Sequence, residues 1–385
     1  MDRTQENRRD FLKAVAGVAV ATVGSPAVFE PSVSSAVQSP DEKGKSSPPK
    51  IRFAAINVNH SHIYGMVDSV IRGGGAMVSF YAPEADLSAE FGKRYPQAKL
   101  ARGEKEILED RSIQLVLSSG IPDQRAPLGI RVMQHEKDYM ADKPGITTLE
   151  QLAEVRRVQA QTRRMFSISY SERFENRATV KAGELVKAGA IGRVIQTVGL
   201  GPHRMNLGQR PAWFFDKKFY GGILCDIASH QVDQFLYFTG SKRAEIAFSQ
   251  VGNVHYPQYP QFEDFGDLVL RGDGGTGYIR VDWFTPDGLS TWGDCRLTIL
   301  GTDGYIEVRK NVDIAGRQGD SHLFLVDNKE TRYIDCTNLK LPFGELFVQD
   351  ILNRTETAMS QEHCLLAMEL VLKAQKNAQR LEFKA

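Results

Sequence analysis

The chain has 385 residues, with 48 lysines and arginines against 47 acidic residues, so its net charge is +1. This length exceeds one ordinary hydrophobic core and predicts two domains. The balanced charge excludes a large basic surface, so nucleic acid is not expected as a partner.

Residues 1–36 are expected to be an export signal that is removed from the folded protein. Arg8 and Arg9 precede an apolar run at residues 14–23, which is too short to span a bilayer comfortably. The arginine pair is typical of twin-arginine export and predicts a periplasmic protein with no membrane span after cleavage. The alternative is a chance arginine pair before an apolar helix. Residues 37–50, rich in Ser, Pro and Lys, predict a disordered leader.

Export restricts the chemistry, because no free nicotinamide pool exists outside the cytoplasm. A redox enzyme there must hold its cofactor tightly, or use none. The four cysteines lack any CxxC spacing. Disulfides are permitted in that compartment, but isolated buried thiols are the preferred interpretation for a chain of this size.

Residues 51–170 predict a Rossmann-like, doubly wound parallel sheet, because short apolar strands alternate with helices. The expected strands are residues 51–56, 77–81, 113–118, 137–140 and 165–170. The expected helices are residues 63–71, 85–95, 126–134 and 149–162.

Residues 171–385 predict an α+β domain with an open, mainly antiparallel sheet. A helix at residues 178–188 precedes strands at residues 194–200, 245–251, 266–271, 276–284, 296–300 and 305–309. Tight turns at residues 272–275 and 302–304 predict hairpins between neighbouring strands. An amphipathic helix is expected at residues 361–380.

The turn after the first strand lies where a dinucleotide-binding domain has its phosphate loop. Asn57, Asn59 and His62 occupy the three glycine positions of G-x-G-x-x-G, and the acid expected after the second strand is missing. His60 and His62 could bind a divalent metal or a phosphate. They could equally line a nicotinamide cofactor, or simply cap the next helix.

Two further segments carry candidate chemistry. Lys143, before Pro144 at the end of the fourth strand, could donate a proton or orient a substrate hydroxyl, unless it is a surface loop residue. Asp226 and His230 are four residues apart and would share one helix face, where the carboxylate could orient the imidazole. Residues 213–215, Trp-Phe-Phe, could stack on a sugar or belong to the core.

Taken together, these residues resemble the Gfo/Idh/MocA family over residues 51–385. The resemblance rests on Asp142-Lys143-Pro144, which is similar to the family's Glu-Lys-Pro, and on residues 221–233, which are similar to its Gly-Gly-x-x-x-Asp-x-x-x-His-x-x-Asp. It implies a sugar or cyclitol oxidoreductase that uses NAD or NADP, with Lys143, Asp226 and His230 as its catalytic group.

The resemblance also implies which residues meet the cofactor. They are Asn57, Asn59, His60, His62, Ser118 and Lys143. The loop after the third strand lacks the family's frequent histidine, and Arg125 stands in its place. Some twin-arginine-exported relatives keep their nicotinamide permanently bound, and an open sheet face favours pairing of two subunits.

Three functions therefore remain open. The first is hydride transfer between a nicotinamide cofactor and a small-molecule carbohydrate, with His230 managing the hydroxyl proton. The second is a non-redox lyase or hydratase acting on an oxidised sugar, with a metal at His60, His62 and His230. The third is an inactive binding protein that kept the fold and lost the chemistry.

Overall fold

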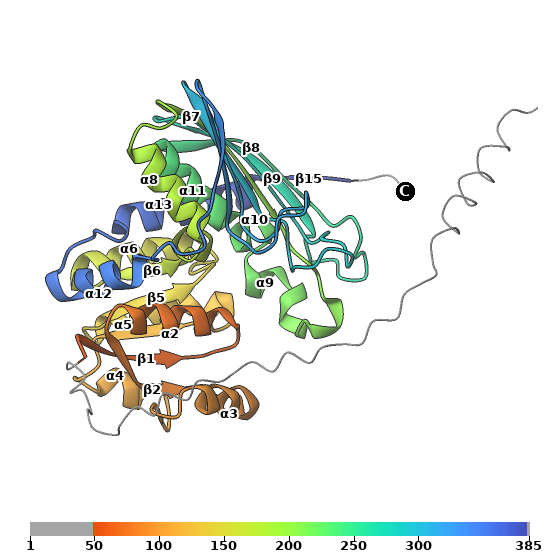
Figure 1. Cartoon of the computed structure of the whole chain (residues 1–385). Coiled ribbons are helices and arrows are strands. Elements are labelled where there is room, and N and C mark those ends of the chain that lie inside the picture. The colour runs from red at the N-terminus through yellow and green to blue at the C-terminus, as the bar shows by residue number, and fades with distance from the viewer. Residues whose placement is uncertain (1–48, 383–385) are drawn as a thin grey trace, which may run out of the picture. The chain divides into compact units, whose positions relative to one another are not determined.

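The computed structural model describes residues 49–382. The predicted export signal at residues 1–36, and residues 37–48 of the predicted leader, lie outside the described residues. The described residues fall in one compact unit, which contains two sheets and therefore two lobes (Figure 1).

The first lobe is built on a six-stranded sheet in which every pairing is parallel. The strand order is β3-β2-β1-β4-β5-β6. The strands are β1 (Ile51–Ile56), β2 (Gly75–Tyr81), β3 (Lys99–Leu100), β4 (Leu115–Ser118), β5 (Asp138–Asp142) and β6 (Phe166–Ser169). The predicted Rossmann-like sheet is confirmed, and only the two-residue edge strand β3 was not foreseen, because it is too short to show a pattern.

Helices cover both faces of this sheet. They are α2 (His62–Arg72), α3 (Ala85–Arg94), α4 (Glu104–Glu109), α5 (Pro122–Gln134) and α6 (Leu149–Thr162). Because both faces are covered, the central strands are apolar along their whole length, and every residue of β4 and β6 is buried. The start of α6 is fixed by Thr148, whose side chain accepts a hydrogen bond from the Gln151 backbone N–H.

The second lobe is built on a nine-stranded sheet with the order β14-β13-β12-β11-β7-β10-β9-β8-β15. The strands are β7 (Val194–Pro202), β8 (Ala244–Gly252), β9 (Phe265–Gly272), β10 (Thr276–Asp282), β11 (Arg296–Gly301), β12 (Gly304–Arg309), β13 (His322–Asp327), β14 (Thr331–Ile334) and β15 (Gln379–Arg380). Only the β7–β10 and β8–β15 pairs are parallel. The predicted open, mainly antiparallel sheet is confirmed, although β13, β14 and β15 were not foreseen.

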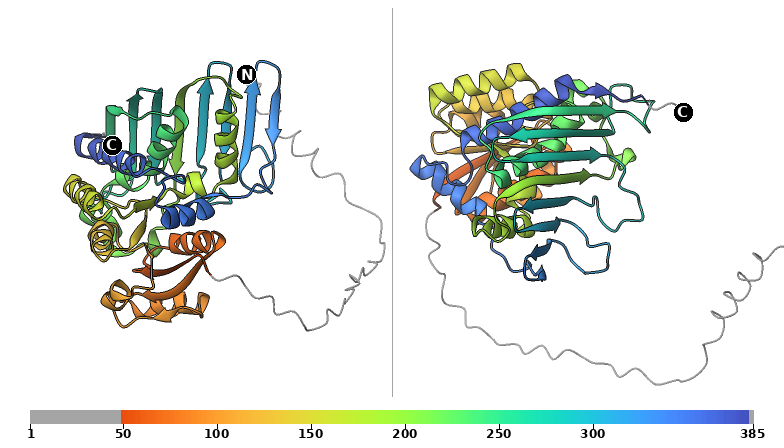
Figure 2. Two further views of the ribbon diagram at one scale, coloured as in Figure 1. Left: turned by 90° about the vertical axis from the view of Figure 1, so that its left-hand side faces the viewer. Right: turned by 90° about the horizontal axis from the view of Figure 1, so that it is seen from above.

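The remaining helices connect the two sheets or cover the second one. They are α7 (Ser171–Phe174), α8 (Arg177–Lys187), α9 (Lys217–Tyr220), α10 (Ile223–Asp226), α11 (Ala228–Thr239), α12 (Phe343–Asn353) and α13 (Gln361–Asn377), with 3-10 turns η1 (Leu207–Gln209) and η2 (Ala212–Phe215). Helices α8, α11 and α13 pack on one face of the nine-stranded sheet. Figure 2 shows the strands of its other face without a covering helix.

The C-terminal helices return to the first lobe. Helix α12 packs on α2, and α13 packs on both α6 and β6 as well as on β8. The α2–α12 contact is so close that a Cβ atom added at Gly344 would lie 1.9 Å from the Ser69 carbonyl oxygen. The two lobes are therefore bound together by chain segments far apart in sequence.

All four cysteines, Cys225, Cys295, Cys336 and Cys364, are free and buried, which confirms the preferred interpretation of isolated thiols. Among residues 49–382, no helix has both the length and the apolar character that a membrane crossing requires.

Candidate active site

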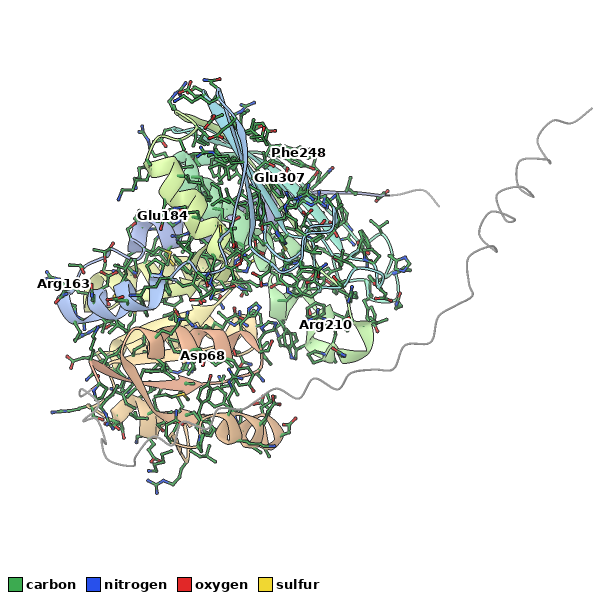
Figure 3. The ribbon with its side chains drawn as sticks, in the orientation of Figure 1. Asp68, Arg163, Glu184, Arg210, Phe248 and Glu307 are labelled. Carbon is green, nitrogen blue, oxygen red and sulfur yellow. The ribbon has the colours of Figure 1, made fainter. Side chains whose placement is uncertain are left out.

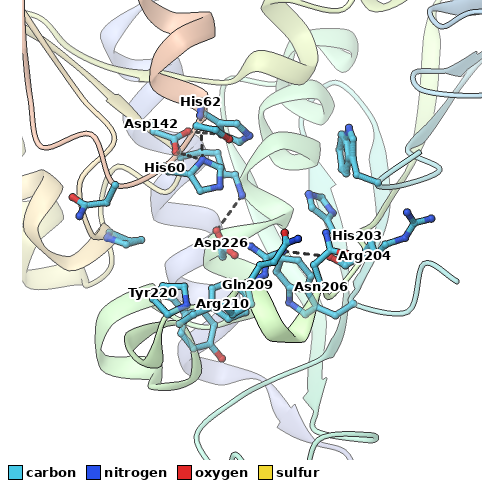
Figure 4. Close-up of a pocket in the computed structure, with 18 of the residues that line it drawn as sticks. His60, His62, Asp142, His203, Arg204, Asn206, Gln209, Arg210, Tyr220 and Asp226 are labelled. Atoms are coloured by element: carbon cyan, nitrogen blue, oxygen red, sulfur yellow. Dashed lines mark hydrogen bonds and ion pairs between the residues drawn. The ribbon is translucent and has the colours of Figure 1, made fainter. Parts of the chain in front are cut away.

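A pocket of about 530 Å³ is lined by residues from both lobes. One side, called the first-lobe wall, consists of residues 59–62, Arg125, Asp142 and Lys143. The opposite side, called the second-lobe wall, consists of His203, Arg204, Asn206, Gln209, Arg210, Trp213, Phe214, Trp283 and Trp292. Glu172 and His230 also line the pocket, as do Tyr220 and Asp226, which Figure 4 labels.

The three residues predicted to be catalytic meet in this pocket. The Lys143 ammonium donates a hydrogen bond of 3.0 Å to Asp226 Oδ1, and both side chains are largely buried. Lys143 comes from the end of β5 and Asp226 from the end of α10, so the ion pair joins the two lobes. His230, near the start of α11, is buried, and its ring also lines the pocket.

The expected bond between Asp226 and His230 is not formed, which corrects the prediction that the carboxylate orients the imidazole. The two residues do not share one continuous helix, because α10 ends at Asp226 and α11 begins at Ala228. Asp226 is paired with Lys143 instead. The buried Nδ1 of His230 has no hydrogen-bond partner among the described residues.

Burial and the neighbouring Lys143 ammonium hold the pKa of His230 well below its usual range. The imidazole is therefore neutral near pH 7. A neutral ring in contact with the pocket can accept a proton, whereas an imidazolium could only donate one.

His60 and His62 converge on Asp142 at the carboxyl ends of β1 and β5. His62 Nδ1 lies 2.9 Å from Asp142 Oδ1, and His60 Nδ1 lies 3.5 Å from Asp142 Oδ2. One donor atom from each of the three residues lies within 4.8 Å of the others. Asp142 was named from the sequence only as part of the Asp142-Lys143-Pro144 motif and was given no role, because its contacts with His60 and His62 are made by the fold. The alternative metal set named from the sequence was His60, His62 and His230, whereas the group of potential ligands that converges in the structure has Asp142 in place of His230.

Arg125 forms a buried ion pair with the Asp142 carboxylate. Its Nη2 lies 3.2 Å from Asp142 Oδ2, and its Nε donates 2.7 Å to the Gly120 carbonyl oxygen. Burial alone would raise the pKa of Asp142, but His62 and Arg125 outweigh it and hold that pKa well below its usual range. Asp142 is therefore a fixed, ionised carboxylate.

The turn between β1 and α2 keeps part of the geometry of a phosphate loop. Asn57 adopts the left-handed conformation, φ 59°, that the first glycine of the fingerprint would supply. Asn59 donates a 2.8 Å hydrogen bond to Glu84 Oε1, while Glu84 Oε2 is buried with no partner among the described residues. Glu84 follows the end of β2 by three residues, so a carboxylate lies close to this turn although none stands directly after the strand.

Asn57 and Ser118 do not line the pocket itself. The Ser118 hydroxyl accepts a 3.2 Å hydrogen bond from the Gly120 N–H, and it lies 3.5 Å from the Asn57 carbonyl oxygen. Of the six predicted cofactor-binding residues, Asn59, His60, His62 and Lys143 reach the pocket. The other two shape the loops behind it.

The second-lobe wall is aromatic. The His203 ring packs against Trp283 and Trp292, with centroids 5.3 and 4.7 Å apart. The Arg210 guanidinium lies over the rings of Phe214 and Trp283, and its Nε donates to the Met205 carbonyl oxygen. Figure 3 labels Arg210 in the segment between β7 and α9. Phe214 belongs to the core and also lines the pocket. The sequence did not predict His203, Trp283 or Trp292 as pocket residues, because residues at strand ends and in loops follow no periodic pattern.

A network of buried polar side chains surrounds the part of α11 that carries His230. Glu172 pairs with Lys310, and its Oε2 also accepts a 3.0 Å hydrogen bond from Gln231 Nε2. Lys310 donates 3.1 Å to Gln234 Oε1. Since Gln231 and Gln234 lie on α11 next to His230, this network fixes the helix that carries the imidazole.

The first lobe has the strand order 3-2-1-4-5-6 of a Rossmann-like nucleotide-binding domain, and the second lobe has an open mixed sheet. Because both lobes line one pocket, the fold is that of a two-domain α/β protein. The family model for the Gfo/Idh/MocA C-terminal domain matches residues 179–307. An oxidoreductase from Erwinia carotovora atroseptica is 47% identical, with a TM-score of 0.84, and the match covers 86% of this chain and 100% of that one. The chain belongs to the Gfo/Idh/MocA family of oxidoreductases.

More distant solved structures share the fold. An oxidoreductase from Thermotoga maritima is 20% identical with a TM-score of 0.73, over 85% of this chain and 98% of that one. A levoglucosan dehydrogenase, solved with NADH and levoglucosan, is 15% identical with a TM-score of 0.68, over 85% and 97%. No curated protein matches the chain in sequence.

Proposed function

We propose that the protein transfers hydride between a nicotinamide cofactor, NAD or NADP, and a hydroxyl-bearing carbon of a sugar or sugar derivative. The observation that carries the proposal is the convergence of Lys143, Asp226 and His230 in one pocket opposite an aromatic wall. The levoglucosan dehydrogenase of the same fold was solved with NADH and a sugar derivative, which supports the same class of reaction here.

The residues of the first lobe fit a dinucleotide. Asn57 supplies the left-handed turn, and the unpartnered Glu84 Oε2 is a suitable acceptor for a ribose hydroxyl. Asn59 and Lys143 would meet the cofactor nearer the reacting centre. A buried carboxylate oxygen without a partner is costly, so a hydroxyl donor at that place would relieve an existing penalty.

Bound nicotinamide would supply the hydride acceptor or donor. The protein's own groups would manage the proton. The Lys143 ammonium, held by Asp226, is placed to donate a hydrogen bond to the substrate oxygen and stabilise its developing negative charge. The neutral His230 imidazole accepts the hydroxyl proton during oxidation and returns it during reduction.

The second-lobe wall is suited to bind the carbohydrate. Aromatic rings such as Trp283 and Trp292 pack against the apolar C–H faces of a sugar, while Arg210 and Asn206 offer hydrogen-bond donors to its hydroxyls. This arrangement favours a small carbohydrate over a flat or wholly apolar ligand.

The test is to release ligands from the purified, folded protein for mass spectrometry, and then to follow nicotinamide absorbance with a panel of sugars. We expect bound or saturable NAD(P) and turnover with at least one sugar. His135→Ala, an exposed histidine away from the pocket, is the matched control for His230→Ala. A folded protein that neither binds nicotinamide nor turns over any sugar in the panel would contradict the proposal.

We also propose that the chain is exported by the twin-arginine route, as residues 1–36 suggest, and that the mature protein works in the periplasm. Replacing Arg8 and Arg9 by lysine should trap a reporter fusion inside the cell, and unchanged export would refute the route.

We further propose that two copies pair through the uncovered face of the nine-stranded sheet, where Ile195, Phe248 and Tyr305 are exposed. Light scattering on the purified protein tests this pairing.

A further inference from the structure

We propose that His60, His62 and Asp142 bind one divalent transition-metal ion, for which Zn²⁺ is the reference probe. Two imidazoles and one carboxylate are a common ligand set for such ions. Among the described residues, these three are the group of potential ligands whose donor atoms converge within 4.8 Å. The inference goes beyond hydride transfer and does not depend on it.

Each imidazole lies at nearly the distance from one Asp142 oxygen that a shared metal requires. A tetrahedral ion bound at about 2.0–2.1 Å separates its ligands by roughly 3.3 Å. The His62 Nδ1 to Asp142 Oδ1 distance is 2.9 Å, and the His60 Nδ1 to Asp142 Oδ2 distance is 3.5 Å. Figure 4 shows the three side chains pointing toward one another. Side-chain rotations that bring the donor atoms from within 4.8 Å of one another to this spacing would complete the site.

The carboxylate is already oriented for ligation. Lys143 donates its backbone N–H to Asp142 Oδ1 at 2.7 Å, and Arg125 holds Oδ2 at 3.2 Å. Groups that fix a ligand in this way are typical of metal centres, because they reduce the cost of ordering it. Each carboxylate oxygen keeps a further lone pair for a metal.

The two histidines are accessible, in contrast to the buried carboxylate. Their side chains are 37% and 38% exposed, and both line the pocket. The Nδ1 of His60 makes two long contacts, 3.3 Å with the His62 backbone N–H and 3.5 Å with Asp142 Oδ2, which cost little to exchange for a metal bond. An ion can therefore enter from the pocket.

Three protein ligands leave coordination positions free, which is the arrangement of a catalytic rather than a structural site. Because Lys143 and Asp226 line the same pocket, a free position would be available to an oxygen of the ligand in that pocket. The ion would act there as a Lewis acid that polarises a carbonyl or stabilises an alkoxide.

The experiment measures metal binding directly, with neither nicotinamide nor sugar present. The full chain, freed of any affinity tag, is stripped with a chelator and titrated with Zn²⁺ in a calorimeter and with Co²⁺ in a spectrophotometer. We expect about one ion per chain, visible Co²⁺ absorption, and a Zn²⁺-dependent rise in melting temperature.

His60→Ala and His62→Ala should each weaken Zn²⁺ binding by more than about 100-fold, since removing a ligand costs more than removing a group behind it. His135→Ala should bind Zn²⁺ like the wild type. Wild-type protein that binds no Zn²⁺, or histidine variants that keep wild-type affinity, would overturn the proposal. If one histidine variant fails to fold without metal, the Zn²⁺ affinity of the other variant and the wild-type Co²⁺ spectrum still test whether these residues bind the ion.

The outcome is separable from that of the proposed function. A protein that binds Zn²⁺ through these residues but never reduces nicotinamide loses the proposed function and keeps the metal site. A protein that turns over sugar with NAD(P) but shows no metal binding loses only the metal site.

Discussion

The two walls of the pocket differ in how their charges are compensated. On the first-lobe wall, Asp142 faces Arg125 and two histidines, and Lys143 faces Asp226. On the second-lobe wall, Arg210 forms no ion pair among the described residues and rests instead on aromatic rings and backbone carbonyls. The difference agrees with the division that we propose, in which the first-lobe wall and His230 handle the proton and the ion and the second-lobe wall binds the carbohydrate.

His230→Ala tests the proposed proton acceptor, which lines the pocket between the two walls. This substitution should lower the activity more than any other. We expect no measurable turnover, because the proton acceptor is lost, while the melting temperature falls only moderately. Steady-state kinetics and thermal unfolding measure the two effects. Retained turnover in a folded His230→Ala protein would remove the imidazole from the mechanism.

Lys143→Met tests whether the first-lobe wall stabilises the reacting oxygen. We expect kcat to fall by about 100-fold or more, with little change in KM, because a positioned hydrogen-bond donor acts on the transition state. Lys187→Met, on the exposed end of α8, is the matched control. A wild-type kcat for Lys143→Met would show that the ion pair with Asp226 is structural.

Trp292→Ala tests the second-lobe wall and should give the opposite kinetic pattern. Loss of one aromatic contact is worth about 1 kcal/mol, so KM for the sugar should rise roughly 3- to 10-fold while kcat changes little. Leu100→Ala is the control, because Leu100 is 52% exposed on the edge strand β3 and does not line the pocket. A fall in kcat without a change in KM would contradict the division between the walls.

Acid should destabilise the fold through its neutral histidines. Burial lowers the pKa of His203 to about 3 and that of His230 well below its usual range, whereas both titrate near 6.5 in the unfolded chain. Below pH 6.5 these two imidazoles are protonated in the unfolded chain but stay neutral in the folded protein. The free energy of unfolding therefore falls as the pH falls, by up to about 1.4 kcal/mol per pH unit for His230.

Urea unfolding at several pH values measures this slope. His230→Gln should flatten the slope between neutral and mildly acidic pH, and His135→Ala should leave it unchanged. An unchanged slope in His230→Gln would show that the buried ring is protonated in the folded protein.

The sequence was sufficient to predict the fold because hydrophobic periodicity marks long elements. It predicted β1, α6 and the hairpin between β11 and β12, where apolar pattern and turn residues agree. It could not reveal β3 or β15, each two residues long, whose pairing is decided by neighbouring strands.

The site was predicted only where a motif marks it. Lys143, Asp226 and His230 could be named because a tripeptide and a helix pattern carry them, but their pairing could not. The break at Ile227, which separates Asp226 from His230, has no sequence signal. The contacts of Asp142 and Glu84 were not predicted, because they are made with His62 and Asn59, which only the fold brings close.

The close contact between α12 and α2 has a consequence for biosynthesis. Gly344 touches Ser69, so the outer surface of α2 stays uncovered until the last tenth of the polypeptide has left the ribosome. We therefore expect the first lobe to complete its packing only after the C-terminal helices have been synthesised, with the outer side of α2 exposed to solvent until then.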